Sequence, residues 1–142
     1  METVNQKKPV VLVVDDDELA AKAVVKVLER RGFDMLVAHS GAEGIRVLSQ
    51  NPVDVLVLDV MMPQMNGLEV CRELRGNRQF DDLPVILLTG CDDFETRAAG
   101  MKLGVSEFLC KPFAHHELID RINTQLDARR ISRLLDTLAE TL

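Results

Sequence analysis

The chain has 142 residues, 23 of them acidic and 17 basic, and its net charge is −6. This length suits one domain, and the negative charge argues against direct nucleic-acid binding, since such a surface must neutralise phosphates. No apolar run approaches the ~20 residues of a membrane span, and no signal-peptide pattern opens the chain. The three cysteines lack C-x-x-C spacing, which favours a reduced, cytoplasmic protein with unpaired thiols.

The first third of the chain alternates strand patterns with helical patterns. Residues Val10–Val14 are continuously apolar and mostly β-branched, as in a parallel strand with both faces covered. A helix is predicted over Leu19–Arg31 and a second strand over Asp34–Ala38. The residues Ser40–Glu43 have the capping-box pattern, so the next helix begins there and runs to about Gln50.

The rest of the chain continues this alternation. Helices are predicted within Gly67–Gly76 and from a cap at Asp92 or Asp93 to about Leu103, and a long helical pattern runs from about Ala114 to the end. Strands are predicted over Val53–Leu58, Pro84–Leu88 and Glu107–Cys110. Five strands that alternate with five helices imply parallel strands with right-handed crossovers. The predicted fold is α/β: a doubly wound, five-stranded parallel sheet of flavodoxin-like order 2-1-3-4-5, with an extended C-terminal helix.

Polar residues follow the C-terminal ends of four predicted strands: Asp15 and Asp16, Asp59, Thr89, and Lys111. Parallel strands bring these ends to one edge of the sheet, and strands one and three are neighbours, so three carboxylates should converge. Two carboxylates about 4 Å apart repel by roughly 4 kcal/mol at an effective dielectric near 20. Mg²⁺ fits such a set of oxygen ligands without nearby His or Cys, and Lys111 adds a fixed positive charge.

The same residues suit phosphoryl transfer to a carboxylate. Asp59 stands alone at its strand end and is the best candidate for the nucleophile, which leaves Asp15 and Asp16 to hold the metal. The metal and Lys111 would stabilise charge on the phosphoryl oxygens, and the Thr89 hydroxyl could donate to one of them.

Taken together, these residues resemble the receiver domain of a two-component response regulator. The resemblance rests on the paired acids after V-V-L-V-V, the string D-V-M-M-P-Q-M-N-G, Thr89 and F-L-C-K-P-F, in this order between about Pro9 and Leu126. It implies a receiver domain over residues 1–126. It also implies a signalling switch rather than an enzyme, with at most self-phosphorylation and self-dephosphorylation activity. A sensor histidine kinase, a phosphotransfer protein or a small phosphodonor would phosphorylate Asp59.

The resemblance also assigns roles to single residues. Asp16 and Asp59 would bind Mg²⁺ together with the backbone carbonyl of Met61, and Asp15 would bind it through a water molecule. Lys111 would contact the phosphoryl group, and in this family the peptide bond from this lysine to the following proline is usually cis.

A switch pair is the last part of the resemblance. Thr89 and Phe108 match it: the hydroxyl would move toward the phosphate and the ring would turn inward, changing the face formed by helix four, strand five and helix five. Many relatives have Tyr at position 108, so a ring hydroxyl has no part in this chain.

Plainer interpretations and rival functions remain. One acid after the first strand, Asp17 in our interpretation, should cap the first helix, and Phe108 is as much a core residue as a switch. The chain could instead be an aspartyl-phosphate phosphatase or phosphotransferase with Asp15 as nucleophile in a D-x-D arrangement. Against that rival, Leu19 stands where its pattern has Thr or Val. A third reading is an adaptor that binds partners without phosphorylation.

Residues 127–142 extend the chain beyond the expected receiver domain. A short heptad seam is formed by Ile131, Leu135, Leu138 and Leu142, in a different phase from an earlier stripe of Leu118, Ile122 and Leu126. One interpretation is a helix whose end packs back on its own domain. The other is a signalling helix, a linker to an output domain, that pairs with a second copy. A homodimer through this helix, or through the helix-four, strand-five and helix-five face, is therefore an open expectation.

Overall fold

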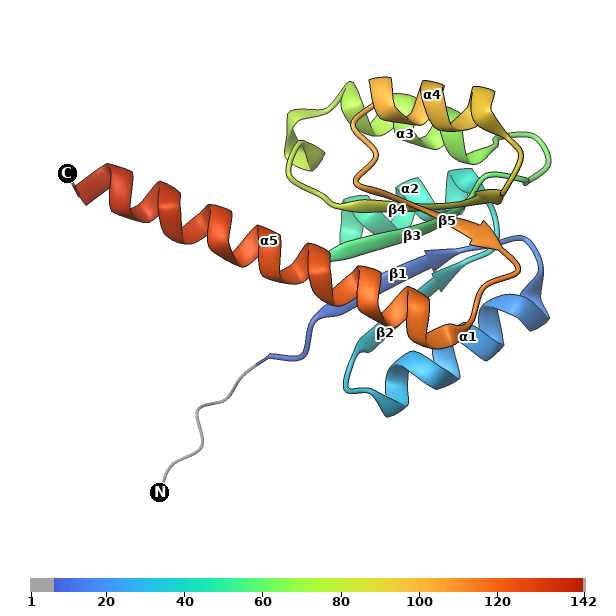
Figure 1. Ribbon diagram of the computed structural model, residues 1–142, viewed down its shortest axis with the longest axis horizontal. Coiled ribbons are helices and arrows are strands. Elements are labelled where there is room, and N and C mark those ends of the chain that lie inside the picture. Colours follow the sequence, from blue (N-terminus) through green and yellow to red (C-terminus); the bar gives the residue numbers. More distant parts are fainter. Residues whose placement is uncertain (1–6, 142) are drawn as a thin grey trace.

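The computed structural model describes residues 7–141 and contains a five-stranded parallel sheet of order β2-β1-β3-β4-β5 (Figure 1). The strands are β1 (Val10–Val14), β2 (Asp34–Ala38), β3 (Val55–Asp59), β4 (Val85–Gly90) and β5 (Glu107–Lys111). The helices are α1 (Glu18–Arg30), α2 (Gly41–Gln50), α3 (Gly67–Arg75), α4 (Phe94–Lys102) and α5 (His115–Thr141), with a short 3-10 helix η1 (Arg78–Phe80). The predicted fold class and strand order are confirmed.

β3, β4 and β5 differ from the predicted strands by one or two residues at their ends, and two of these differences bear on the site. β3 begins at Val55 and not at Val53, because the Asp54 side chain turns back to accept a hydrogen bond from the Val10 amide at 2.8 Å. β4 runs through Thr89, which pairs with Cys110 of β5, so Thr89 lies within the ladder and not beyond its end. The backbone of Thr89 is therefore held by the sheet itself.

Side-chain caps fix where the first two helices begin. The Asp17 carboxylate accepts hydrogen bonds from the amides of Leu19 and Ala20, both at 3.1 Å, which confirms Asp17 as the cap of α1. Ser40 caps α2 by accepting from the Glu43 amide at 3.1 Å. In a standard capping box the Glu43 carboxylate would accept from the amide of the cap residue, Ser40. Here it accepts instead from the amide of His39, the preceding residue, at 2.7 Å.

The core consists of two layers, one on each face of the sheet (Figure 1). Successive strand residues point to opposite faces, which is why these strands read as continuous apolar runs. The face toward α1 and α5 buries Val11, Val13, Val55, Val57, Ile86 and Leu88. The face toward α2 and α3 buries Leu12, Val14, Leu56, Leu58, Val85 and Leu87. Burial of each such side chain stabilises the fold by roughly 1.5–3 kcal/mol. The strand ends that carry the polar residues are therefore anchored in a well-packed core.

The side chain of Arg75, at the end of α3, joins the end of η1 to the α4–β5 turn, near the end of the sheet where the strands begin. Its guanidinium donates to the carbonyls of Leu103 and Phe80, both at 2.8 Å, and of Gly104 at 3.0 Å. Gly104 has φ +74°, a left-handed conformation that suits glycine and turns the chain from α4 into β5. These contacts fix the edge strand β5 relative to α3.

The second half of α5 projects past the sheet (Figure 1). Its first half packs on the core through buried Leu118, Ile119 and Ile122. Beyond it, four apolar side chains are between 57% and 60% exposed: Ile131, Leu134, Leu135 and Leu138. The interpretation that this end packs its seam back on its own domain is therefore wrong for the described residues; Leu142 lies outside them. Among residues 7–141, no helix has both the length and the apolar character needed to cross a membrane.

Candidate functional site

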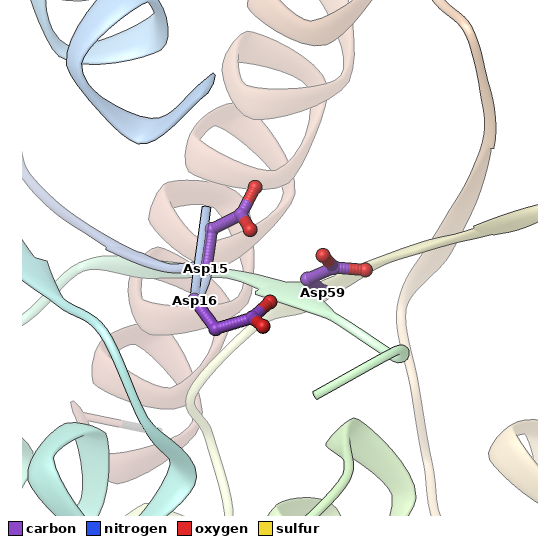
Figure 2. A group of neighbouring side chains, drawn as sticks. All are labelled: Asp15, Asp16 and Asp59. Atoms are coloured by element: carbon purple, nitrogen blue, oxygen red, sulfur yellow. The ribbon is translucent and has the colours of Figure 1, made fainter. Parts of the chain in front are cut away.

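Three carboxylates converge at the C-terminal ends of β1 and β3, as the sequence predicts. One oxygen each from Asp15, Asp16 and Asp59 lies within 4.8 Å of the other two. Figure 2 shows the three side chains side by side, two from the end of β1 and one from the end of β3. The acids are more than forty positions apart in sequence, so it is the neighbouring position of the two parallel strands that brings them together.

The Asp59 carboxylate is nearly enclosed and both of its oxygens have donors. The residue is 3% exposed. Its Oδ2 accepts a hydrogen bond from Lys111 Nζ at 2.7 Å, and its Oδ1 accepts from the Met61 amide at 3.2 Å. The lysine side chain is itself 40% exposed, so a group that arrives from solvent meets the lysine and the carboxylate together.

Asp15 and Asp16 differ sharply in their surroundings. Asp15 is 5% exposed, and Asp16 faces solvent. Burial raises the pKa of Asp15, the Asp17 amide at 2.9 Å lowers it, the negative charge of Asp59 raises it, and Lys111 lowers it. The balance is a raised pKa, because desolvation disfavours the charged form most.

The donor set at this edge fits a hard divalent cation. Three carboxylates face one lysine, so the cluster carries more negative charge than its cation offsets. The side-chain atoms that could bind a metal are all carboxylate oxygens, which is the ligand type that Mg²⁺ takes in proteins. The described structure therefore agrees with the magnesium prediction in its chemistry and in the placement of the acids.

The start of α3 packs directly against the Asp59 end of β3. A Cβ atom at Gly67 would lie 2.7 Å from the Asp59 carbonyl oxygen and 2.9 Å from Val60 Cα, so only glycine allows this approach. The Gly67 amide donates to the Val60 carbonyl at 3.0 Å, and Asn66 and Glu69 complete a capping box on α3. This packing holds the loop that carries Met61 beside the carboxylate.

Thr89 and Phe108 lie on the same face of the sheet, one on each of two paired strands. Thr89 is 1% exposed, and its hydroxyl donates to the Gly90 carbonyl at 3.4 Å. The half-buried Phe108 ring packs against α4, where a Cβ atom at Gly100 would lie 2.8 Å from ring atom Cε1. The hydroxyl is thus held by one long hydrogen bond, while the ring already occupies space between β5 and α4.

Several contacts at this edge carry no motif in the sequence. The Met61 amide bond to Asp59 belongs to the backbone, so no side-chain pattern signals it. Arg97 of α4 lies with Nη2 2.6 Å from the Cys110 sulfur, and this pair depends on how α4 sits over β5. The peptide bond between Lys111 and Pro112 is cis, as the family resemblance implies.

Comparison with known proteins agrees with this geometry. Residues 11–123 match the family described as the response regulator receiver domain. The chain is 43% identical over 116 residues to "Response regulator MprA" of Mycobacterium tuberculosis, a match that covers 82% of this chain and 50% of that protein. The protein of the same name from Mycobacterium ulcerans is 42% identical. The chain spans about half the length of these curated relatives.

Solved structures show the same arrangement of elements. The receiver domain of the Francisella response regulator 1452 is 37% identical, with a TM-score of 0.78 over 85% of this chain and 98% of that one. A response regulator receiver domain protein from Clostridium thermocellum is 30% identical, with a TM-score of 0.80 over 87% and 98%. A CheY-like protein from Methanospirillum hungatei, at 22% identity and a TM-score of 0.83, shows likeness of fold alone.

Proposed function

This chain belongs to the response regulator receiver domain family, and from that premise we propose that it is a two-component signalling switch that accepts a phosphoryl group on Asp59. One observation carries the proposal. The Asp59 carboxylate is enclosed, paired with Lys111 at 2.7 Å, and grouped with the oxygens of Asp15 and Asp16. The neighbouring carboxylates favour a bound cation, and the Lys111 amine can hold an anionic phosphoryl oxygen. This combination around Asp59 suits phosphoryl transfer.

In the proposed reaction, an Asp59 oxygen attacks the phosphorus of the donor. The donor is a phosphohistidine of a sensor histidine kinase or phosphotransfer protein, or a small acyl phosphate. The new oxygen–phosphorus bond forms as the bond from phosphorus to the donor breaks. Lys111 then shifts its hydrogen bond from the carboxylate to a phosphoryl oxygen. Asp16, Asp59 and the Met61 carbonyl would hold Mg²⁺, with Asp15 acting through water, and the ion would offset charge on the phosphoryl oxygens.

The proposed readout passes through Thr89 and Phe108. The Thr89 hydroxyl exchanges its 3.4 Å bond to Gly90 for a stronger one to the phosphoryl group, because charge-assisted hydrogen bonds are shorter and stronger. Its movement leaves space on the same sheet face, into which the Phe108 ring turns. That ring packs on Gly100, so α4 changes its position relative to β5 and α5. A coupling of about 1–3 kcal/mol would change partner affinity about 5- to 150-fold.

Trapping the phosphoryl group tests this function. After treatment with acetyl phosphate and Mg²⁺, we expect intact-mass analysis to show one added phosphoryl group. After borohydride reduction, peptide mapping should place the modification at Asp59. Chelation of the metal should prevent the addition, because the three acids then repel the incoming anion. Addition that maps to another residue, or that is as fast without metal, would contradict the proposed site.

A second part of the proposal concerns residues 127–142, which we propose extend the receiver domain of residues 1–126 and bind the same segment of a second copy. Ile122 and Ile131 are nine residues apart, which is about two and a half turns of helix. The exposed seam therefore lies opposite the side of α5 that packs on the sheet. It cannot serve the domain's own core, so it is left for a partner.

The charges around this seam favour a second copy as that partner. With Leu135 at position a and Leu138 at position d, the e and g positions between 132 and 141 are uncharged: Ser132, Leu134, Ala139 and Thr141. Asp127 takes an earlier g position, and in a parallel pair it would face the uncharged Ser132. From residue 129 on, the charged residues take the b, c and f positions, away from the seam: Arg129, Arg130, Arg133, Asp136 and Glu140. Arg129 among them faces its own domain, where its guanidinium donates to the Asp54 carbonyl at 2.9 Å. Two parallel copies thus meet without like charges across the seam. The segment spans few heptads, so we expect a weak dimer, in reversible exchange with monomer.

Light scattering over a range of concentrations measures this association. We expect the molar mass to rise with concentration for the intact chain and to stay at the monomer value after removal of residues 128–142. Leu135→Glu should behave like the truncation, because it places like charges in the seam, whereas Thr137→Glu on the outer surface should not. A dimer that survives both changes would place the interface elsewhere, with the α4, β5 and α5 face as the alternative.

A further inference from the structure

A groove lined with basic side chains lies at the end of the sheet where the strands begin, opposite the end that carries the acids. One side is the segment that leads into β1, with Lys7 and Lys8, and the other is the second half of α5, with Arg130 and Arg133. Both segments leave the sheet at this end (Figure 1). This basic groove has a volume of about 480 Å³, within the roughly 300–1,000 Å³ of ligand-binding clefts.

The acidic side chains in the lining do not balance this positive charge. Arg129 is a fifth basic residue of the basic groove, and Asp54 is the one acidic residue in its lining. Asp54 is already engaged, because its carboxylate accepts a hydrogen bond from the Val10 amide at 2.8 Å and lies 3.7 Å from the Arg129 guanidinium. The other four basic side chains are therefore left without a carboxylate in the lining.

Ion pairs outside the lining do little to neutralise them. Among residues 7–141, no ion pair joins Lys7, Lys8 or Arg133 to an acid. Arg130 lies 3.8 Å from Asp127, but both side chains are at least 70% exposed, and such pairs contribute little. In a chain of net charge −6, the basic groove is thus a local region of the opposite sign, which would attract an anionic partner.

Most of the remaining lining is apolar. On α5 the lining runs from Leu126 to Thr137, which is about 16 Å of helix. Leu126, Arg130 and Leu134 follow one another at steps of four, so they form one stripe along this wall. Leu134 is 59% exposed. The segments before β1 and β3 add further apolar residues: Pro9, Val10 and Pro52. An elongated groove with apolar and cationic side chains matches a helix that is apolar on one side and acidic beside it.

We propose that the basic groove binds an acidic amphipathic helix of a partner protein. The apolar side of that helix packs on Leu126 and Leu134, and its carboxylates pair with the cations of both walls. A nucleic acid suits the groove less, because a duplex extends past it onto a chain of net charge −6 and has no apolar side chains to bury. A partner bound here lies at the far end of the sheet from Asp59, so that carboxylate stays open to a phosphodonor.

Fluorescence anisotropy with the full chain and a labelled synthetic peptide tests this binding. The peptide has about four helical turns, with leucine at helical spacing and glutamate elsewhere. We expect it to bind, and its affinity to fall as salt is raised from about 0.1 M to about 1 M, because the Debye length falls from about 10 Å to about 3 Å. A peptide with glutamine for every glutamate should bind at least about tenfold more weakly. Equal binding of both peptides, or binding of neither, would overturn the proposal.

Charge reversal on each wall locates the site. The pair Lys7→Glu and Lys8→Glu changes one wall, and the pair Arg130→Glu and Arg133→Glu changes the other. Each pair should weaken binding of the glutamate peptide at least about tenfold, because each places like charges against the peptide. All four side chains are exposed, so we expect circular dichroism to show an intact fold. Unchanged affinity in either pair would mean that the peptide does not lie between the two walls.

A matched control separates the groove from net charge. Lys22→Glu with Lys26→Glu, on exposed positions of α1, makes the same change in charge elsewhere and should alter the affinity by less than about twofold. A larger loss would refute a specific groove. A short DNA duplex that binds more tightly than the peptide would make nucleic acid the occupant, and loss of self-association on reversal of Lys7 and Lys8 would make it a second copy. Asp59→Asn should bind the peptide as the unaltered chain does, so failure of the proposed phosphoryl transfer would leave this result unaffected.

Discussion

The Asp59→Asn variant is expected to take up no phosphoryl group from acetyl phosphate and Mg²⁺, whereas Asp15→Asn should remain phosphorylated on Asp59 at a reduced rate. The amide lacks the anionic oxygen that attacks phosphorus, so the loss at position 59 should be complete. In the proposed site Asp15 acts only on the metal, and loss of such a supporting group typically costs about 10- to 100-fold in metal affinity or activity. Intact mass against time, at several Mg²⁺ concentrations, measures both effects.

The same pair of variants separates the switch from its enzymatic rival. In an aspartyl-phosphate phosphatase with Asp15 as nucleophile, hydrolysis of a generic phosphate ester would survive Asp59→Asn and be lost in Asp15→Asn. That reversed pattern would refute the switch. The Lys111 amine, which would hold the phosphoryl group, pairs with Asp59 and not with Asp15. Asp15 is buried and accepts a hydrogen bond from the Asp17 amide, which suits a supporting residue better than a nucleophile. We expect the ester to be hydrolysed no faster with the unaltered chain or with either variant than without protein.

The adaptor alternative makes a different prediction for the intact chain. Beryllofluoride with Mg²⁺ mimics an acyl phosphate, and we expect it to shift amide resonances near Thr89, Phe108 and α4. The Thr89 hydroxyl has only its 3.4 Å bond to Gly90 to give up, so its movement costs little. An unchanged amide spectrum in the presence of both reagents would favour an adaptor that binds partners without phosphorylation.

Much of the fold and of the acidic cluster could be predicted because both depend on simple periodicities. Strands buried on both faces are continuous apolar runs, and the residue that follows each run must lie at one edge of a parallel sheet. That reasoning placed Asp59 and Lys111 on the same rim although they are 52 residues apart, and the structure joins them at 2.7 Å. Asp17 was predictable as a cap for a different, local reason: acidic residues are favoured just before the first turn of a helix.

Contacts that depend on how helices sit over strands could not be predicted. The guanidinium of Arg97 contacts the Cys110 sulfur only because α4 lies over β5 there, and Arg75 reaches three carbonyls in two separate segments, the end of η1 and the α4–β5 turn. Neither arginine stands out in the sequence, since both occupy ordinary helical positions. The direction of the exposed seam on α5 is an intermediate case. Its change of phase was visible beforehand, but only the structure shows which side packs on the sheet.

The crowding of the acids also predicts an effect on stability. Without Mg²⁺, Asp15→Asn should raise the free energy of unfolding at pH 7 by about 1–3 kcal/mol, which is less than an isolated carboxylate pair would give because Lys111 offsets part of the repulsion. Urea denaturation measures the change. Asp17→Asn is the matched control, because asparagine also caps a helix and position 17 lies outside the cluster.

The pH dependence of this gain has a definite sign. The pKa of Asp15 is raised in the folded protein above its ordinary value of 3.8, so the folded state binds this proton more tightly than the unfolded state does. Ionised Asp15 therefore destabilises the fold at neutral pH, and the penalty disappears as the pH falls through the folded pKa. The advantage of Asp15→Asn should be full at pH 7 and absent below about pH 3.8. An advantage that persists there would contradict the electrostatic origin.

Magnesium should remove most of the difference in unfolding free energy between the unaltered chain and Asp15→Asn. An ion that binds only the folded state stabilises it by RT ln(1 + [Mg²⁺]/Kd), and we expect the unaltered chain, with all three acids, to have the lower Kd. At a Mg²⁺ concentration about 100-fold above the Kd of the unaltered chain, this term is about 2.7 kcal/mol for that chain. A variant that binds 10- to 100-fold more weakly gains only about 0.4–1.4 kcal/mol, so Mg²⁺ favours the unaltered chain by about 1.3–2.3 kcal/mol, which is comparable to the repulsion that the variant relieves. The same carboxylate thus weakens the metal-free fold and strengthens the loaded one. If Asp15→Asn were stabilised by Mg²⁺ as much as the unaltered chain, Asp15 would have no part in holding the metal.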